Sequence, residues 1–203
     1  MAEIEILIEG YFKNISRTRC RASSTIVLIK DSGKNILVDT GNPQDKEKII
    51  NALKKRKLKT KDIDIVVITH FHPDHLGCNY LFKEARFIVP GVSFWDDIFD
   101  RAPKNQRLSK NLGRISTPGH SADSATLLVK SDKGVVACAG DLFWFEGDEK
   151  IKLLEEDCFN KELLHKNRQK ILKIADFIIP GHGKMFKVRV GDVDSVARNF
   201  VNK

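Results

Sequence analysis

The sequence has no run of uncharged apolar residues near the roughly 18 that a membrane-spanning helix needs. Its first ten residues carry three glutamates among aliphatic side chains, which is not the pattern of a secretory signal peptide. The four cysteines, Cys20, Cys78, Cys138 and Cys158, are far apart and form no Cys-x-x-Cys pair. We therefore expect no membrane association, a cytoplasmic location, and reduced thiols in place of a disulfide framework.

The composition is that of a globular protein, with 41% hydrophobic and 31% charged residues. A chain of 203 residues is long enough to bury a sizeable core and leaves no room for a second large domain. We expect residues 1–203 to form a single domain.

The net charge of +8 is concentrated in one segment. Residues 46–61 carry eight Lys or Arg and one Glu. A basic excess can indicate a nucleic-acid partner. However, the order of predicted elements puts Lys54–Lys61 at the end of a strand remote from the candidate site, where the cations stabilise a helix C-terminus.

Runs of β-branched residues alternate with helical patterns, which predicts a layered α/β architecture. The predicted strands are Ile4–Ile8, Thr25–Ile29, Asn35–Val38, Ile63–Ile68, Arg86–Val89, Thr126–Val129, Val135–Ala139, Phe177–Ile179 and Phe186–Val190. The predicted helices are Asp45–Lys57, His75–Phe82, Lys161–Ile174 and Asp192–Asn202. Two strand pairs flank short polar turns at Asp31–Lys34 and Ser131–Gly134, which predicts hairpins.

Five of the six histidines lie in turns that follow predicted strands. Three belong to Thr69-His-Phe-His-Pro-Asp-His75, directly after an apolar strand, where open α/β sheets place ligands. His120 and His182 each follow a Pro-Gly turn, and Asp141 follows the strand that ends at Gly140. Only His165 lies inside a helical pattern, and we interpret it as an ordinary surface or core histidine.

Imidazoles and carboxylates are the ligands that zinc and similar divalent ions prefer. A lone Pro-Gly-His is weak evidence, because histidines are common in such turns. The His-x-His-x-Asp-His block is far more specific, since it places four ligand side chains within six residues. Seven groups exceed the needs of one tetrahedral ion, so the pattern predicts two ions that share a bridging ligand.

The ordered motifs Asp39-Thr-Gly41, His70-Phe-His-Pro-Asp-His75, Pro118-Gly-His120, Gly140-Asp141 and Pro180-Gly-His182 resemble the metallo-β-lactamase fold superfamily. The resemblance implies an α/β (α+β) fold, a four-layer αβ/βα sandwich with metals at one edge of two mixed sheets. It implies one metal held by His70, His72 and His120, a second held by Asp74, His75 and His182, and a bridging Asp141. Asp39 would orient a ligand, or be only a turn residue. Two Zn²⁺ ions are expected, and iron or manganese stays open.

The resemblance implies a hydrolase in which a metal-bound hydroxide attacks the substrate and Asp74 and Asp141 orient it. It favours a branch that includes a zinc-dependent endoribonuclease, hence phosphodiester hydrolysis in RNA. The aspartate at position 141 departs from the cysteine of zinc β-lactamases, and His72 departs from the glutamate of flavodiiron proteins. The alternatives are a thioester or lactone hydrolase of the glyoxalase II type, promiscuous β-lactam hydrolysis, and a mononuclear-iron persulfide dioxygenase.

The substrate can be RNA or a small molecule, and three features bear on that choice. The predicted loop Gly10–Ser24 carries Lys13, Arg17, Arg19 and Arg21 without an acid, and it is either a phosphate-binding element or a solvated hairpin. The acidic stretch Glu146–Asp157 argues against a uniformly basic groove. Aromatic side chains either line a pocket or pack in the core, namely Phe94, Trp95, Phe143, Trp144 and Phe145. A homodimer stays open.

Overall fold

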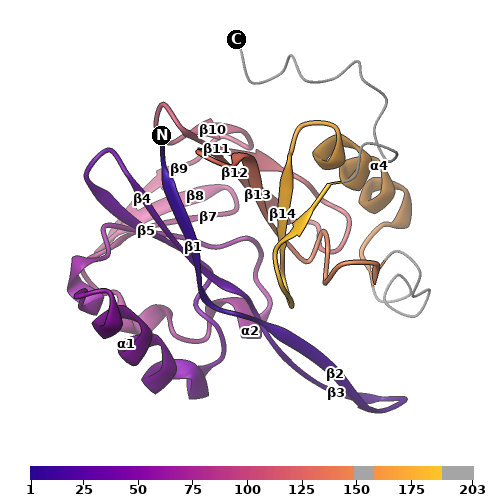
Figure 1. The fold of residues 1–203 in the computed structure, drawn as a ribbon, viewed down its shortest axis with the longest axis horizontal. Helices are drawn as coiled ribbons and strands as arrows, with labels where there is room; N and C mark the ends of the chain where they lie inside the picture. The colour runs from indigo at the N-terminus through magenta and orange to yellow at the C-terminus, as the bar shows by residue number, and fades with distance from the viewer. Residues whose placement is uncertain (149–157, 189–203) are drawn as a thin grey trace.

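The computed structural model describes residues 1–148 and 158–188, which fold around two facing sheets (Figure 1). The seven-stranded sheet one has the order β1 (Glu3–Ile8), β4 (Ile26–Asp31), β5 (Lys34–Val38), β6 (Ile65–Val67), β7 (Arg86–Val89), β8 (Val92–Trp95), β9 (Ile98–Arg101). The six-stranded sheet two has the order β10 (Gln106–Arg107), β11 (Leu112–Ser116), β12 (Ala125–Ser131), β13 (Gly134–Gly140), β14 (Phe177–Pro180), β15 (Phe186–Lys187). Both sheets mix parallel and antiparallel pairs.

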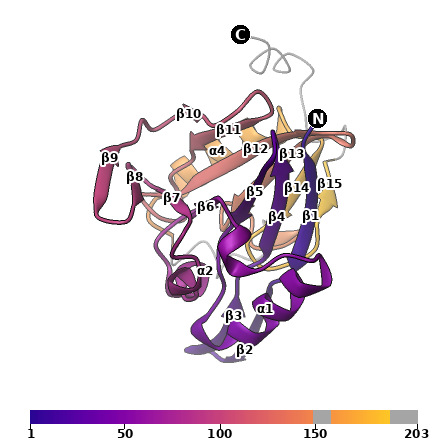
Figure 2. The ribbon, with the colours of Figure 1, turned by 90° about the vertical axis from the view of Figure 1, so that its left-hand side faces the viewer.

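Alternation along the central strands produces a four-layer sandwich. In β4, Ile26 and Leu28 pack under helix α1 (Lys46–Lys55), whereas Val27 and Ile29 face sheet two. In β13, Val136 and Cys138 lie between the sheets, and Ala137 and Ala139 pack against helix α4 (Lys161–Leu172). Three apolar clusters therefore separate four layers, with one helix outside each sheet (Figures 1 and 2). This confirms the predicted fold class.

The predicted strands are all present in the described residues, with shifted ends, and β7 matches its predicted bounds. Both predicted hairpins form, and Ser32 and Gly33 of the first turn have positive φ values of 52° and 77°. The strand predicted over Phe186–Val190 is observed over Phe186–Lys187, and its last two residues lie outside the described ranges. The predicted helix Asp192–Asn202 also lies outside them.

The helix predicted over His75–Phe82 is wrong in its extent. The structure has a short α2 (Pro73–Leu76) and a separate 3₁₀ turn (Asn79–Leu81); two more 3₁₀ turns span Pro43–Asp45 and Thr60–Asp62. The N–H of Gly77 donates to the carbonyl of Gly41 at 2.8 Å instead of to a helical partner. A β-carbon on Gly77 would lie 2.5 Å from the ring of Pro43, so this close backbone contact ends the helix.

The predicted loop Gly10–Ser24 has the hairpin form that was one of its two alternatives. It consists of β2 (Tyr11–Ser16) and β3 (Arg19–Ser23) and projects from the body (Figure 1). Strands β8, β9, β10 and β11 were not predicted. Their segments are short or interrupted by polar residues, so they lack the long β-branched runs that mark the central strands.

Residues 54–61 of the basic segment lie at the end of sheet one that is remote from the histidines, as predicted, whereas Lys48 bonds Asp45 nearer to them. Arg56, just after α1, donates to both carboxylate oxygens of Glu5 on β1 at 2.7 and 2.8 Å. Asn35, at the start of β5, donates to the carbonyl of Asp62. In the described ranges, no helix has the length and apolar character needed to cross a bilayer.

Candidate metal centre

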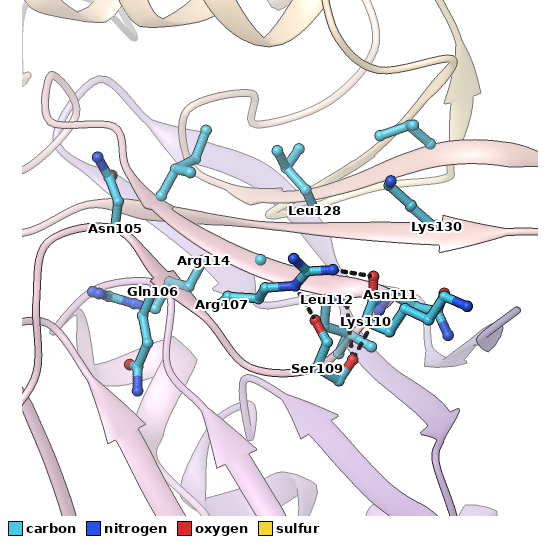
Figure 3. A pocket seen from close by; sticks show the side chains of 13 residues that line it. Asn105, Gln106, Arg107, Ser109, Lys110, Asn111, Leu112, Arg114, Leu128 and Lys130 are labelled. Carbon is cyan, nitrogen blue, oxygen red and sulfur yellow. Dashed lines mark hydrogen bonds between the residues drawn. The ribbon is translucent and has the colours of Figure 1, made fainter. Parts of the chain in front are cut away.

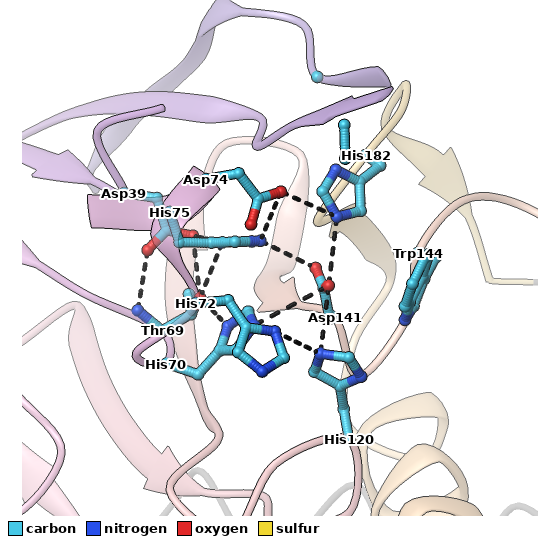
Figure 4. Close-up of polar contacts among 12 residues, drawn as sticks. Asp39, Thr69, His70, His72, Asp74, His75, His120, Asp141, Trp144 and His182 are labelled. Carbon is cyan, nitrogen blue, oxygen red and sulfur yellow. Dashed lines mark hydrogen bonds and ion pairs between the residues drawn. The ribbon is translucent and has the colours of Figure 1, made fainter. Parts of the chain in front are cut away.

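All seven predicted ligands converge at one edge of the two sheets (Figure 4). Strand β6 runs parallel to β5 and β7, so the histidine block follows it at the edge where β5 also ends. Strands β11, β13 and β14 all point toward this edge and are followed by His120, Asp141 and His182 respectively. The four segments are distant in the sequence and are brought together by strand order alone.

The ligand atoms form two groups. His70, His72, His120 and Asp141 offer atoms within 4.8 Å of one another, and so do Asp74, His75 and His182. Asp141 stands between the groups. Its Oδ1 lies 3.1 Å from Nε2 of His75, and its Oδ2 lies 3.2 Å from Nε2 of His182 and 3.4 Å from Nε2 of His120. One carboxylate thus faces both groups at once.

Several buried nitrogen and oxygen atoms of the cluster lack hydrogen bonds within the described part of the chain, as expected for atoms that bind cations. Nε2 of His70, Nε2 of His75 and Oδ1 of Asp141 are buried and make no hydrogen bond among the described residues, although the last two form a 3.1 Å ion pair. Unpaired buried polar atoms cost about 1–3 kcal/mol each, so such an arrangement calls for a ligand. Five imidazoles and two carboxylates are a donor set suited to zinc and related divalent ions. The residues present therefore fit a metal centre.

Burial and neighbouring charge shift the pKa values of four of the clustered histidines, two downward and two upward. Burial lowers the pKa of His70 well below its ordinary value and that of His120 to about 4, which keeps both imidazoles neutral and able to bind a cation. Burial also acts on His75 and His182, but the charge of Asp141 outweighs it and raises the pKa of both. Burial alone would raise the pKa of Asp141, yet His182 and His75 hold it well below its ordinary value.

Contacts behind the ligands fix their orientation. Asp39 Oδ2 lies 2.7 Å from Nδ1 of His75, and Asp39 also accepts from the backbone N–H and the hydroxyl of Thr69 at 2.8 and 2.9 Å. Nδ1 of His182 lies 3.0 Å from the carbonyl of Ser23. In each case one ring nitrogen is engaged and Nε2 faces the cluster. This supports the predicted orienting role of Asp39.

Glycines allow the strand ends to approach one another closely. A β-carbon on Gly181 would lie 1.9 Å from Oδ1 of Asp141, and one on Gly140 would lie 2.6 Å from the hydroxyl of Thr69. Gly140 also has a φ of 52°, which favours glycine. In the Pro-Gly-His and Gly-Asp motifs, the glycine therefore leaves room for the neighbouring segment to approach, and this close approach positions the adjacent ligand.

Two aromatic side chains border the cluster. The ring of Trp144 lies 5.5 Å from that of His120 and 5.5 Å from that of His182 (Figure 4). Phe12 of β2 meets Trp144 edge-on at 4.8 Å. Trp144 was among the predicted candidates, whereas Phe12 was missed because its segment was interpreted as a loop. Tyr11–Ser16 has apolar residues at positions 11, 12 and 15 without regular alternation, so the sequence offered no clear strand signal there.

The other predicted aromatic side chains lie away from the cluster. Phe143 is buried beneath α4, Phe94 stacks on Phe87, and Trp95 is exposed. Phe145 is half-buried, with its β-carbon beside Gly183. His165 is exposed on α4, consistent with its interpretation as a non-ligand.

The predicted cationic residues of the hairpin are exposed, and Lys13 pairs across the strands with Arg21. Because neighbouring strand residues point to opposite faces, Lys13 and Arg21 lie on the face away from Phe12. The acidic residues of the predicted stretch Glu146–Asp157 lie partly outside the described residues. The cations therefore sit beside the site and do not face the ligands directly.

A separate hollow of about 330 Å³ lies against sheet two (Figure 3). Gly113, Ile115 and Leu128 contribute to its lining, and Arg107 crosses it to bond the carbonyls of Ser109 and Lys110. None of the seven clustered ligands lines it. It is therefore distinct from the candidate metal centre.

Comparison with known proteins agrees with the fold. The family model described as "Metallo-beta-lactamase superfamily" matches residues 20–93. The chain is 34% identical to metallo-beta-lactamase domain-containing protein 1 of Xenopus laevis, over 91% of this chain and 81% of that protein. It is 35% identical to the human protein of the same name, over 75% of this chain and 59% of that one.

Among solved structures, a Thermotoga maritima protein described as a metallo-beta-lactamase superposes with a TM-score of 0.74 at 19% identity. The match covers 92% of this chain and 99% of that one, and it bears on the fold alone. Two sheets carrying a histidine and aspartate cluster at one edge define a metallo-hydrolase. The chain belongs to the metallo-beta-lactamase superfamily, as the motifs predicted.

Proposed function

We propose that the protein is a hydrolase with a dinuclear metal centre. The observation that carries this proposal is the division of seven candidate ligands into two groups, with Asp141 of the first group also 3.1 Å from His75 and 3.2 Å from His182 of the second. His70, His72 and His120 would hold one ion, and Asp74, His75 and His182 the other. Zinc suits this donor set best, and iron or manganese are the alternatives.

Divalent ions bound here would lower the pKa of a water molecule and polarise the bond to be cleaved. The chain's own contribution follows from exposure. The side chain of Asp74 is 20% exposed and that of Asp141 is 3% exposed. Asp74 can therefore meet an incoming water or substrate and accept a proton at a carboxylate oxygen, whereas Asp141 orients the groups around it. Trp144 and Phe12 exclude water from one side.

We infer RNA phosphodiesters as the substrate class. Directly opposed like charges such as Lys13 and Arg21 destabilise a two-stranded hairpin, and a polyanion would offset that cost. Arg17 and Arg19 extend the same exposed element away from the site. Trp144 offers a planar surface on which a base can stack next to His120.

A small-molecule thioester or lactone is the second candidate substrate. The observation that favours it is the orientation of the hairpin, since its aromatic residue Phe12 is turned toward His182 while Lys13 and Arg21 are turned away. An acyl chain would pack on the Phe12–Trp144 wall without any cation. Such a reaction would depend little on salt, whereas RNA binding weakens steeply with it.

Elemental analysis of protein purified without added metal tests the centre. Two transition-metal ions per chain are expected, and fewer than one would contradict the proposal. A single iron per chain would favour the persulfide dioxygenase reaction instead. His70→Ala and Asp141→Asn should each lower the metal content and abolish hydrolysis.

A side-by-side assay of RNA, single-stranded DNA, thioester, lactone and β-lactam substrates tests the substrate class. Wild type is compared with Asp141→Asn to exclude contaminants. RNA cleavage that falls with salt and with the triple change of Arg17, Arg19 and Arg21 to Gln supports the first candidate. Salt-independent hydrolysis of an acyl substrate, unaffected by that triple change, supports the second.

A further inference from the structure

Sheet one ends in an exposed strand. β9 is the last strand in the sheet order, and all four of its residues are exposed. It lies at the outer limit of the molecule, remote from the helices (Figure 2). Natural edge strands are commonly protected by Pro, a bulge, charged side chains or short length; Ile98–Arg101 has no Pro or bulge, but it is short and carries Asp100 and Arg101.

Large apolar side chains are concentrated on this edge. Ile98 and Phe99 are 55% and 67% exposed, and Trp95 of the paired strand is 52% exposed. Phe99 is the end of an aromatic ladder. Phe94 stacks on Phe87 at 5.0 Å with an interplanar angle of 6°, and on Phe99 at 5.3 Å with an angle of 23°. The ladder starts in the core at Phe87 and stops at the open edge.

The backbone at this edge is available for pairing. Ala102 donates to the carbonyl of Gly91 at 3.0 Å, and the register pairs Asp100 with Ser93. In an antiparallel ladder only alternate residues bond to a given neighbour. Asp100 and Ala102 therefore face β8, while the N–H and C=O groups of Phe99 and Arg101 point outward.

We propose that β9 pairs with β9 of a second copy of this chain, antiparallel, with the two-fold axis at Phe99. This register sets Phe99 against Phe99 and continues the aromatic ladder across both chains. It also sets Asp97, in the turn that directly precedes β9, opposite Arg101 of the other chain. Within the described residues neither Asp97 nor Arg101 takes part in an ion pair, whereas Asp100 is paired with Arg86.

The charge pattern selects a second copy over an unrelated strand. A two-fold axis makes the interface self-complementary, so one acid and one base per chain yield two opposite-charge pairs. The strand is short, and an edge of this size gives a small interface with weak, micromolar association. The dimer extends sheet one on the side away from β1 and leaves the ligand edge of both copies open.

Sedimentation equilibrium of the full chain, from micromolar to several hundred micromolar, tests the proposal. Wild type should dimerise within this range. Arg101→Asp places two acids opposite each other and should weaken the dimer at least tenfold. The double change Asp97→Arg with Arg101→Asp restores opposite charges and should restore dimerisation. Phe99→Ser, which shortens the ladder, should also weaken the dimer.

Lys133→Asp is the matched control, because it makes the same charge change at the turn between β12 and β13 on the other sheet. It should dimerise like wild type. Circular dichroism checks that each variant is folded. A monomeric wild type throughout the range overturns the proposal. The proposal is also overturned if Arg101→Asp leaves the dimer affinity unchanged, or if the double variant dimerises no more strongly than Arg101→Asp alone.

Discussion

Asp39 holds His75 by a contact of 2.7 Å between Oδ2 and Nδ1, and this turns Nε2 of His75 toward Asp141. Asp39 does so from a left-handed backbone conformation with a φ of 57°, which Asp tolerates better than most residues. Its side chain is 3% exposed, so its position is fixed by its partners. An aspartate outside the set of candidate ligands thus orients a histidine that would bind metal.

Asp39→Ala should lower the affinity for added Zn²⁺ by about 10–100-fold, the usual effect of losing an orienting carboxylate. Competition with a chromophoric chelator measures this. Asp31→Ala is the control, because Asp31 is also buried but bonds Asn111 away from the cluster. Equal zinc affinities in the two variants would contradict the orienting role of Asp39.

Gly181→Ala should displace Asp141, since the added β-carbon would lie 1.9 Å from its Oδ1. We expect loss of metal from both groups, because Asp141 faces both. Metal content and thermal melting are the readouts. Gly113→Ala is the control, since no atom lies within 4 Å of the added carbon. Full metal content in the Gly181 variant would show that Asp141 is not shared.

Arg168→Met should destabilise the protein by about 3–5 kcal/mol, because it removes the guanidinium from a buried ion pair with Asp148. Arg168 of α4 contacts Asp148 at 2.7 Å and also donates to the carbonyl of Leu142. Asp148 accepts from the N–H of Trp144 at 2.7 Å. Urea denaturation measures the loss. Lys170→Met, on the same helix, should change stability little.

Asp45 should make the free energy of unfolding depend on pH. Burial alone would raise its pKa, but hydrogen bonds from Lys48, Ser23 and the Asn42 backbone outweigh this and lower it. A lowered folded-state pKa stabilises the protein above the unfolded pKa of about 3.9, and that stability is lost as the pH falls through the folded value.

Wild type should therefore exceed Asp45→Asn in unfolding free energy by about 1–3 kcal/mol at pH 7. The difference should shrink as the pH falls from about 5 toward 3, because the unfolded and then the folded carboxyl becomes protonated. Urea titrations of both proteins at several pH values measure it. A difference that stays constant down to pH 3 would contradict the lowered pKa of Asp45.

The ligands were predictable because each one is marked by its own local pattern. The sequence alone shows the histidine block after Val67 and the Pro-Gly-His turns at His120 and His182, because recognising them requires no knowledge of tertiary contacts. Phe12 was not, because nothing local distinguishes a strand that points at a metal centre from a loop. The helix predicted at His75 was too long, because the contact between Gly77 and Pro43 joins segments 34 residues apart.

The sequence by itself determined the ligand types, their order and the strands that precede them, because these depend on local periodicity and turn chemistry. Only the tertiary structure decided that Asp141 lies between two groups, that Trp144 and not Phe143 borders them, and that β9 is left exposed. Those outcomes depend on which strands become neighbours. Strand order is set by packing across the whole sandwich, which no single segment encodes.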